Sequence, residues 1–180
     1  FVKTGGTFTY GTSTVNYTGG GATNILALNG ASTTDAYYNL NVGDVVDSNS
    51  VTYTMAGATT VNNVLTVSNS GATGTDTLTA NVTLTLKGSG TPLNIVSGKG
   101  QIASSYYSGS KFIFASSSGT TALSTIDLTG ADGGNRFGWL DINGTGTFNI
   151  GSGIDFNATR FTVENGTLAG SNNNINVDNF

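Results

Sequence analysis

The sequence predicts an all-β protein that folds as a β-solenoid, a parallel β-helix of stacked coils. Its 180 residues include 27 Gly and one Pro, and 37% are apolar while only 9% are charged. Such a chain has enough apolar material to fold and is rich in residues suited to strands. Short runs alternate apolar and polar residues throughout, and the second half of the chain echoes the first. A pilin-like β-sandwich is the alternative fold.

The expected strands are short, and each has one apolar face because side chains alternate along a strand. In the first half the residues sharing a face are Phe8 and Tyr10, Val15 and Tyr17, Leu40 and Val42, Val51, Tyr53 and Met55, Leu65 and Val67, Val82, Leu84 and Leu86, and Leu93 and Ile95. In the second half they are Phe112 and Phe114, Ile126 and Leu128, Leu140 and Ile142, Phe148 and Ile150, Phe161 and Val163, and Ile175 and Val177.

Between these runs the chain carries clusters of Gly, Asn, Ser and Asp, such as "TGGG", "LNGAS", "SNSGATG", "GADGGN" and "NGTG". These residues tolerate positive φ or bond their own backbone, so each cluster predicts a turn. Many short strands separated by such turns are typical of a β-sandwich or a β-solenoid.

An internal repeat favours the solenoid. Four pairs of segments match in the same order: "TFTYGTS" with "KFIFASS", "YYNLNVG" with "FGWLDIN", "VTYTMAG" with "GTFNIGS", and "TLTANVTLTLKG" with "TLAGSNNNINVDN". Two copies that are each too thin to close a core are expected to stack. We therefore predict two imperfect solenoid repeats, residues 1–100 and residues 101–180, and we expect the second to continue into a next copy.

The alternation also predicts which side chains meet inside the stack, and a slip of one residue would invert every face. The residues expected to point into a common interior are Leu40, Val42, Leu65, Val67, Leu84, Leu86, Leu140, Ile142, Phe161 and Val163. Those expected to point outward are Asn39, Asn41, Thr66, Thr85 and Thr162.

The phrases "GTFTYGTSTVNYTG", "YYNLNV" and "TTVNNVLTV" resemble the Gly-, Thr- and Asn-rich β-helical repeats of very large bacterial surface and secreted proteins. Filamentous haemagglutinin and autotransporter passenger regions are similar in style. The resemblance spans most of the chain and includes no catalytic signature. It implies an extracellular structural or adhesive role and assigns no functional residue.

Composition argues against several classes of function. The net charge is −4 and the six basic residues are scattered singly, so no cationic stripe is expected to bind nucleic acid. The absence of Cys and His removes thiolate chemistry, the commonest general base and the commonest metal ligand. No apolar run has the length of a membrane span. We therefore expect no enzyme activity, no cofactor and no membrane span, and we interpret Phe1 as a processed or excised end.

Asp44 and Asp47, with Asp35 nearby, are candidate calcium ligands, because a hard cation prefers several oxygen ligands from one loop. The loop has neither the EF-hand spacing nor the Gly-Gly-x-Gly-x-Asp nonapeptide. A solvated turn is the simpler interpretation, and no metal site is predicted.

Asp127, Asp132 and Asp141 are candidate paired carboxylates for glycoside hydrolysis, since β-helical polysaccharide enzymes use acids on one sheet. Their spacing demonstrates no shared face. We interpret them as turn and strand acids and predict no catalytic residue.

Aromatic side chains offer candidate platforms for sugar rings, and those considered are Tyr37, Tyr38, Tyr106, Tyr107, Phe137 and Trp139. Alternation sends one of each adjacent pair inward, so about half are expected in the core and the others are ordinary strand residues. The glycine-rich stretches "GGTFTYG" and "TGGGATN" precede neither a helix nor a Lys-Ser/Thr pair, so they predict turns and not phosphate loops.

Five Asn-x-Thr sequons, at Asn16, Asn81, Asn143, Asn157 and Asn165, are candidate acceptors of N-linked sugar. Asn and Thr are abundant here, so several sequons are expected by chance.

Together these patterns predict a structural segment of an extracellular or cell-surface filament, stalk or surface layer whose copies join head to tail. Writing "NINVDNF" before "FVKTGGTFTYG" produces a passage like the internal "LTLKGSGTPLNIV", a strand, a polar turn and another strand. The expected partner is therefore the protein itself, and surface glycans are a further candidate. An adhesin face, a Thr-lined sheet that orders water or binds ice, and a polysaccharide-active enzyme are the alternatives.

Overall fold

The structure is a computed structural model that describes residues 7–21, 23–25, 36–44, 49–96, 98–104, 110–123, 128–130, 137–151, 156–170 and 175–179. The described residues contain strands and turns and no helix. The strands are β1 (Thr14–Tyr17), β2 (Thr23–Ile25), β3 (Tyr37–Val42), β4 (Thr52–Met55), β5 (Thr59–Val67), β6 (Asp76–Thr79), β7 (Thr83–Leu86), β8 (Leu93–Ile95), β9 (Gly100–Ser104), β10 (Lys111–Phe114), β11 (Thr120–Leu123), β12 (Leu128–Gly130), β13 (Phe137–Ile150), β14 (Phe156–Gly170) and β15 (Ile175–Asn179).

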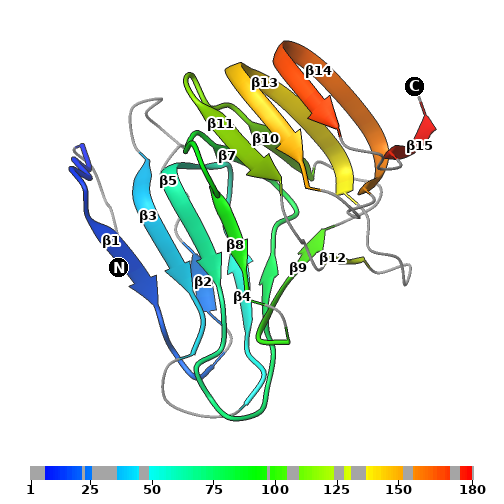
Figure 1. Ribbon diagram of the computed structural model, residues 1–180. Coiled ribbons are helices and arrows are strands. Elements are labelled where there is room, and N and C mark those ends of the chain that lie inside the picture. The colour runs from blue at the N-terminus through cyan, green and yellow to red at the C-terminus, as the bar shows by residue number, and fades with distance from the viewer. Residues whose placement is uncertain are drawn as a thin grey trace.

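The strands form a β-solenoid, as predicted, and not the alternative β-sandwich. The described strands pair in parallel throughout, and they make two sheets. Eight strands of the 10-stranded sheet follow the order β1-β3-β5-β7-β10-β13-β14-β15, and its other two, β8 and β11, pair with β5 and β13. The 5-stranded sheet follows the order β12-β9-β6-β4-β2. Successive coils therefore lie side by side from β1 at one end to β14 and β15 at the other (Figure 1).

The larger sheet bends, so the coil has more than two faces. The first part of β5, Thr59–Val61, pairs with β7, whereas its last part, Leu65–Val67, pairs with β8. In the same way β13 pairs with β10 through its first part and with β11 through its last. The 5-stranded sheet supplies the third face along the part of the stack that runs from β2 to β12.

Apolar side chains of successive coils stack in columns along the interior. Leu84, Phe112 and Leu140 lie in register on neighbouring strands, and each is at most 1% exposed. Of the residues predicted to be inside, those confirmed as buried are Leu40, Val42, Leu65, Val67, Leu84, Leu86, Leu140 and Ile142. The residues predicted to face outward, Asn39, Asn41, Thr66, Thr85 and Thr162, are partly exposed. Each coil buries part of its apolar surface against the next, which stabilises the stack.

The last two residues predicted to point inward lie in register with Leu140 and Ile142, but they are less buried than the rest. Val163 is 45% exposed, and Phe161 is half-buried at the edge of the core. β15 pairs with β14 only between Phe156 and Arg160, so no further described strand covers residues 161–170. Alternation places a side chain on the inner face, but burial requires another coil above it.

Polar ladders cover part of the outer surface. The amide of Asn41 donates to Asn16 Oδ1 at 2.9 Å, and the amide of Asn63 donates to Asn39 Oδ1 at 2.8 Å. On the smaller sheet, Gln101 Nε2 donates to Thr77 Oγ1 at 2.7 Å. Side chains directly opposite each other on adjacent strands stabilise the sheet without adding apolar surface.

Two glycines allow the last coils to approach closely where the chain turns. A Cβ atom on Gly144 would lie 2.2 Å from the backbone oxygen of Ser116, and one on Gly166 would lie 2.3 Å from that of Gly144. Gly166 also has a φ of +94°, which other residues rarely adopt. A side chain at either position would force these coils apart.

The stack continues across residue 100, where the sequence analysis divided the chain into repeats 1–100 and 101–180. β6 pairs with β9, and β7 pairs with β10. The division into two repeats stays a prediction, and the stacked unit of the structure is the single coil.

Candidate functional site

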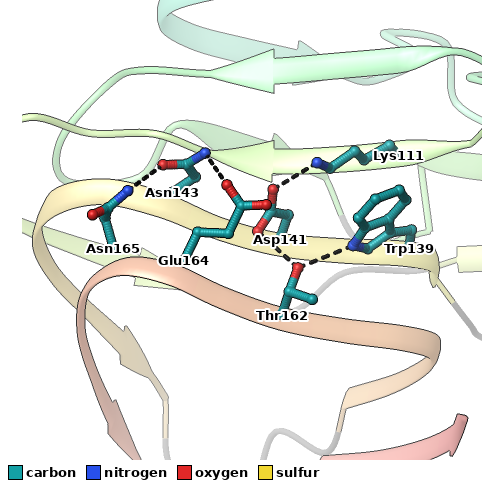
Figure 2. A network of polar contacts seen from close by, with 7 residues as sticks. All are labelled: Lys111, Trp139, Asp141, Asn143, Thr162, Glu164 and Asn165. Atoms are coloured by element: carbon teal, nitrogen blue, oxygen red, sulfur yellow. Dashed lines mark hydrogen bonds and ion pairs between the residues drawn. The ribbon is translucent and has the colours of Figure 1, made fainter. Parts of the chain in front are cut away.

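A network of polar side chains on the larger sheet centres on Asp141 of β13 (Figure 2). Lys111 Nζ lies 2.8 Å from Asp141 Oδ2, and the Thr162 hydroxyl donates to Asp141 Oδ1 at 2.8 Å. Trp139 Nε1 donates to Thr162 Oγ1 at 3.0 Å. The Asp141 side chain is fully buried and that of Lys111 is 19% exposed, so the ion pair is shielded from water. The ammonium is the charge that offsets the buried carboxylate.

Three side chains in register form a stack beside this carboxylate. Lys111, Trp139 and Arg160 occupy the same position on β10, β13 and β14. Lys111 Nζ lies 4.0 Å from the centroid of the indole ring, and Arg160 Cζ lies 4.1 Å from it. Each cation over an aromatic face contributes about 0.5 to 2 kcal/mol, depending on its exposure. The tryptophan is thus held between two cations and does not present a bare face to a sugar ring.

An asparagine ladder extends the network along the same strands. Asn143 Nδ2 donates to Glu164 Oε2 at 2.6 Å, and Asn165 Nδ2 donates to Asn143 Oδ1 at 2.8 Å (Figure 2). Both atoms of the Asn143 amide are therefore engaged. The contacts connect β13 to β14 near the register shift that follows Ile142.

The side chains of this network link neighbouring strands of the sheet. A general acid or base must be able to reach a substrate and exchange a proton with it. Both carboxylate oxygens of Asp141 are occupied, Oδ2 by the Lys111 ammonium and Oδ1 by the Thr162 hydroxyl, and the side chain is fully buried. The geometry favours a role in holding three coils together.

A second buried carboxylate, that of Asp76, lies at the start of β6, the central strand of the smaller sheet. Asp76 Oδ2 accepts a hydrogen bond from the backbone N–H of Asp44 at 2.5 Å. Its Oδ1 accepts from the backbone N–H of Val51 at 2.9 Å and from Asn69 Nδ2 at 3.0 Å. Asn69 Nδ2 also donates to the backbone oxygen of Asn49. The Asp76 carboxylate thereby connects Asp44, which follows β3, to Val51, which precedes β4.

This geometry bears on the proposed calcium ligands. Asp44 is buried, and its backbone N–H donates to Asp76. Both carboxylate oxygens of Asp76 accept hydrogen bonds from N–H groups, so they are already occupied and do not face a cation site. Asp35 and Asp47 lie outside the described residues. In the ranges that the structure describes, no group of three or more His, Cys, Asp or Glu residues could hold a metal ion.

Of the three acids considered for glycoside hydrolysis, only Asp141 has a described position. Asp127 and Asp132 lie outside the described residues. The structure places Asp141 in an ion pair with Lys111, and no second described carboxylate contacts it in the network of Figure 2.

The aromatic candidates divide between the core and the surface. Tyr37 and Phe137 are buried, and the Tyr37 hydroxyl shares a 2.9 Å hydrogen bond with that of Tyr17. Burial raises the pKa of Tyr37 well above its ordinary value, and the hydrogen bond with Tyr17 makes a smaller contribution in the same direction. Tyr38 is partly exposed and stacks on Tyr10, with ring centroids 6.3 Å apart. Tyr106 and Tyr107 lie outside the described residues.

The candidate glycosylation sites differ in exposure and contacts. Asn16, Asn81 and Asn165 are exposed, and Asn143 is partly buried. The amide nitrogens of Asn143 and Asn165 donate hydrogen bonds, whereas Asn16 accepts one through its oxygen. The side chain of Asn157 lies outside the described residues. All five sequons stay predictions.

Sequence reasoning missed both the stack of Lys111, Trp139 and Arg160 and the role of Asp76. Aligning "KFIF", "WLDI" and "RFTV" would have placed the stacked residues in one row, because each precedes the same inward apolar pattern. Asp76 alternates with the buried Leu78, so it falls on the inner face of its strand. An acid on an apolar face is a signal for a buried structural carboxylate.

No family model matches the chain, and no curated protein or solved structure matches it either. Within the described residues there is also no helix of the length and apolarity needed to cross a membrane.

Proposed function

We propose that this chain is a structural segment of an extracellular filament, stalk or surface layer, built from coils that stack end to end. The observation that carries the proposal is the contrast between the sides and the end of the stack. The sides are covered by polar ladders such as Asn16–Asn41 and Gln101–Thr77. The edge of β14 exposes the inward-type residue Val163, which is 45% exposed. No described strand covers residues 161–170, and a solenoid with such an uncovered edge is suited to extension along its axis.

The polar residues of the described chain support a mechanical role more than a catalytic one. Asp141 and Asp76 each connect neighbouring segments and accept hydrogen bonds from fixed donors. Parallel coils joined by backbone ladders, stacked side chains and buried polar links resist bending. The resemblance to bacterial surface repeats, together with the five sequons, supports the extracellular location.

Localisation on the source cells tests this function. Antibodies raised against residues 1–180 should label intact cells or fibres attached to them in immunogold electron microscopy, and external protease should remove the label. Label that appears only after the cells are opened would contradict the proposal. This result does not depend on how copies contact one another.

A second candidate function is an outward Thr surface that orders water or binds a glycan. Thr52 and Thr54 lie in register with Thr77 and Thr79 on neighbouring strands of the smaller sheet. Rungs of a sheet are about 4.8 Å apart, and alternate residues along a strand are about 6.7 Å apart, so the four side chains form a regular grid. Inhibition of ice recrystallisation, or retention on a glycan array, that is lost in Thr54→Lys but kept in Thr66→Lys would support it. Equal behaviour of the two variants would exclude this surface.

A further inference from the structure

We propose that the open edge of β14 binds β1 of a second copy of this chain, with Thr167–Gly170 beside Thr14–Tyr17 in parallel. This inference rests on the proposed function and names the two strands that would join successive copies. It rests on the edges, faces and side-chain sizes of strands that the structure describes.

The receiving edge is the last part of β14. This part pairs with β13 as far as Gly170, while β15 pairs only with Phe156–Arg160. Among the described residues no strand lies on the other side of residues 161–170. Phe161 and Leu168 are half-buried against the core, and Val163 is 45% exposed. An uncovered strand with inward apolar residues favours the addition of another strand.

The donated edge is β1, the strand at the opposite end of the sheet order. The backbone oxygens of Ser13 and Tyr17 accept hydrogen bonds from Asn39 and Gly43 of the neighbouring coil, at 3.1 and 3.0 Å. Because successive backbone groups of a strand point to alternate sides, those of Thr14 and Asn16 point away from β3. Among the described strands, none pairs with β1 on that side.

Neither edge carries the residues that natural proteins use to prevent strand addition. Lys and Pro on an edge strand block pairing with other chains. β1 reads "TVNY" and residues 161–170 read "FTVENGTLAG", with one Glu and no Lys, Arg or Pro. These edges are compatible with pairing to another chain.

The inward or outward facing of the side chains and their sizes determine how β1 aligns with β14. Val15 packs partly against the core and Tyr17 does likewise, so these residues must meet the inward positions Leu168 and Gly170 if both copies keep their faces. A Cβ atom on Gly170 would meet nothing within 4 Å. The large Tyr17 side chain therefore fits over the small Gly170, and Val15 over Leu168, with Asn16 outside and beside Ala169.

The first test uses a chain that has no cysteine of its own. Asn16→Cys combined with Ala169→Cys, treated with a short bismaleimide, should produce a ladder of covalent dimers, trimers and longer species. The matched control combines Thr54→Cys with Ala169→Cys; Thr54 is also outward and exposed but lies on the smaller sheet. Equal ladders in both variants, or no ladder in the first, would overturn the assignment.

The second test blocks the edge without disturbing the interior. Gly170→Lys places a charge on the open edge at the position opposite Tyr17, where an added Cβ atom would meet nothing within 4 Å, so the single chain should still fold with an unchanged circular dichroism spectrum. Sedimentation should show that oligomers of the native chain are lost in Gly170→Lys and retained in Thr54→Lys. A native chain that remains monomeric at high concentration would refute this contact while leaving the structural function open to coils of one continuous polypeptide. Failure of the surface-labelling experiment would instead refute the function.

Discussion

Lys111 and Asp141 form an ion pair across adjacent parallel strands, with Nζ and Oδ2 2.8 Å apart and the carboxylate fully buried. The two residues are not directly opposite, since Lys111 is in register with Trp139 and Ile113 with Asp141. The pair is therefore diagonal. Lys111 Nζ also lies over the indole ring of Trp139, so one ammonium group stabilises both the carboxylate and the stack of side chains.

Removing the ammonium should strongly destabilise the protein. Lys111→Met leaves the Asp141 charge buried without its counter-ion, which costs about 3 to 5 kcal/mol when a buried pair is broken. Urea unfolding measures the change in free energy. Lys87→Met, at an exposed position, is the control and should change stability by less than about 0.5 kcal/mol. Similar losses in the two variants would show that the pair contributes little.

Leu84 should be far more sensitive to truncation than its neighbour Thr85. Leu84 is fully buried in the column that contains Phe112, whereas Thr85 is outward. Leu84→Ala should cost about 2 to 5 kcal/mol through lost burial and a cavity. Thr85→Ser should cost less than about 0.5 kcal/mol. Equal unfolding free energies for the two variants would contradict the facing of β7.

Thr121→Val should stabilise the protein. Thr121 is fully buried, and no described group forms a hydrogen bond with its Oγ1 atom. Valine has nearly the same shape without the hydroxyl, and leaving a buried polar group unsatisfied costs about 1 to 3 kcal/mol. We expect a higher thermal midpoint in the variant. Thr54→Val, at an exposed position, is the control, and a lower midpoint in Thr121→Val would mean that the hydroxyl has a role.

Alkaline pH should weaken the fold through Tyr37. Burial raises the pKa of Tyr37 in the folded state, and its hydrogen bond with Tyr17 adds to this effect. The folded state therefore holds the phenol proton more tightly than the unfolded state. The resulting stability is fully present below the unfolded pKa of about 10 and is lost as the pH rises above it.

The measurement is the unfolding free energy between neutral pH and pH values above about 10, in the native chain and in Tyr37→Phe. The native chain should lose stability more steeply with pH than the variant. Ultraviolet absorbance should show that one tyrosine ionises only as the protein unfolds. Parallel pH dependences in the two proteins would contradict this assignment.

The sequence by itself was sufficient for the fold class and for most of the interior. Alternation is a local property of the strand, so the facing of Leu40, Leu65 and Leu84 could be read directly from their neighbours. The clusters of turn residues marked where strands end. Because the sequence has few charged residues and no helical periodicity, it favoured stacked strands.

Only the tertiary structure decided which coils meet, and in which register. The stack of Lys111, Trp139 and Arg160 joins residues of three strands, and the contact between Asp76 and Asp44 joins the start of β6 to the residues after β3. Such contacts depend on how many residues each turn contributes before the chain returns to the same face. The alternation of apolar and polar residues along a strand does not reveal that number. Val163 illustrates the same division, since its facing follows from alternation while its exposure follows from the absence of a described coil above residues 161–170.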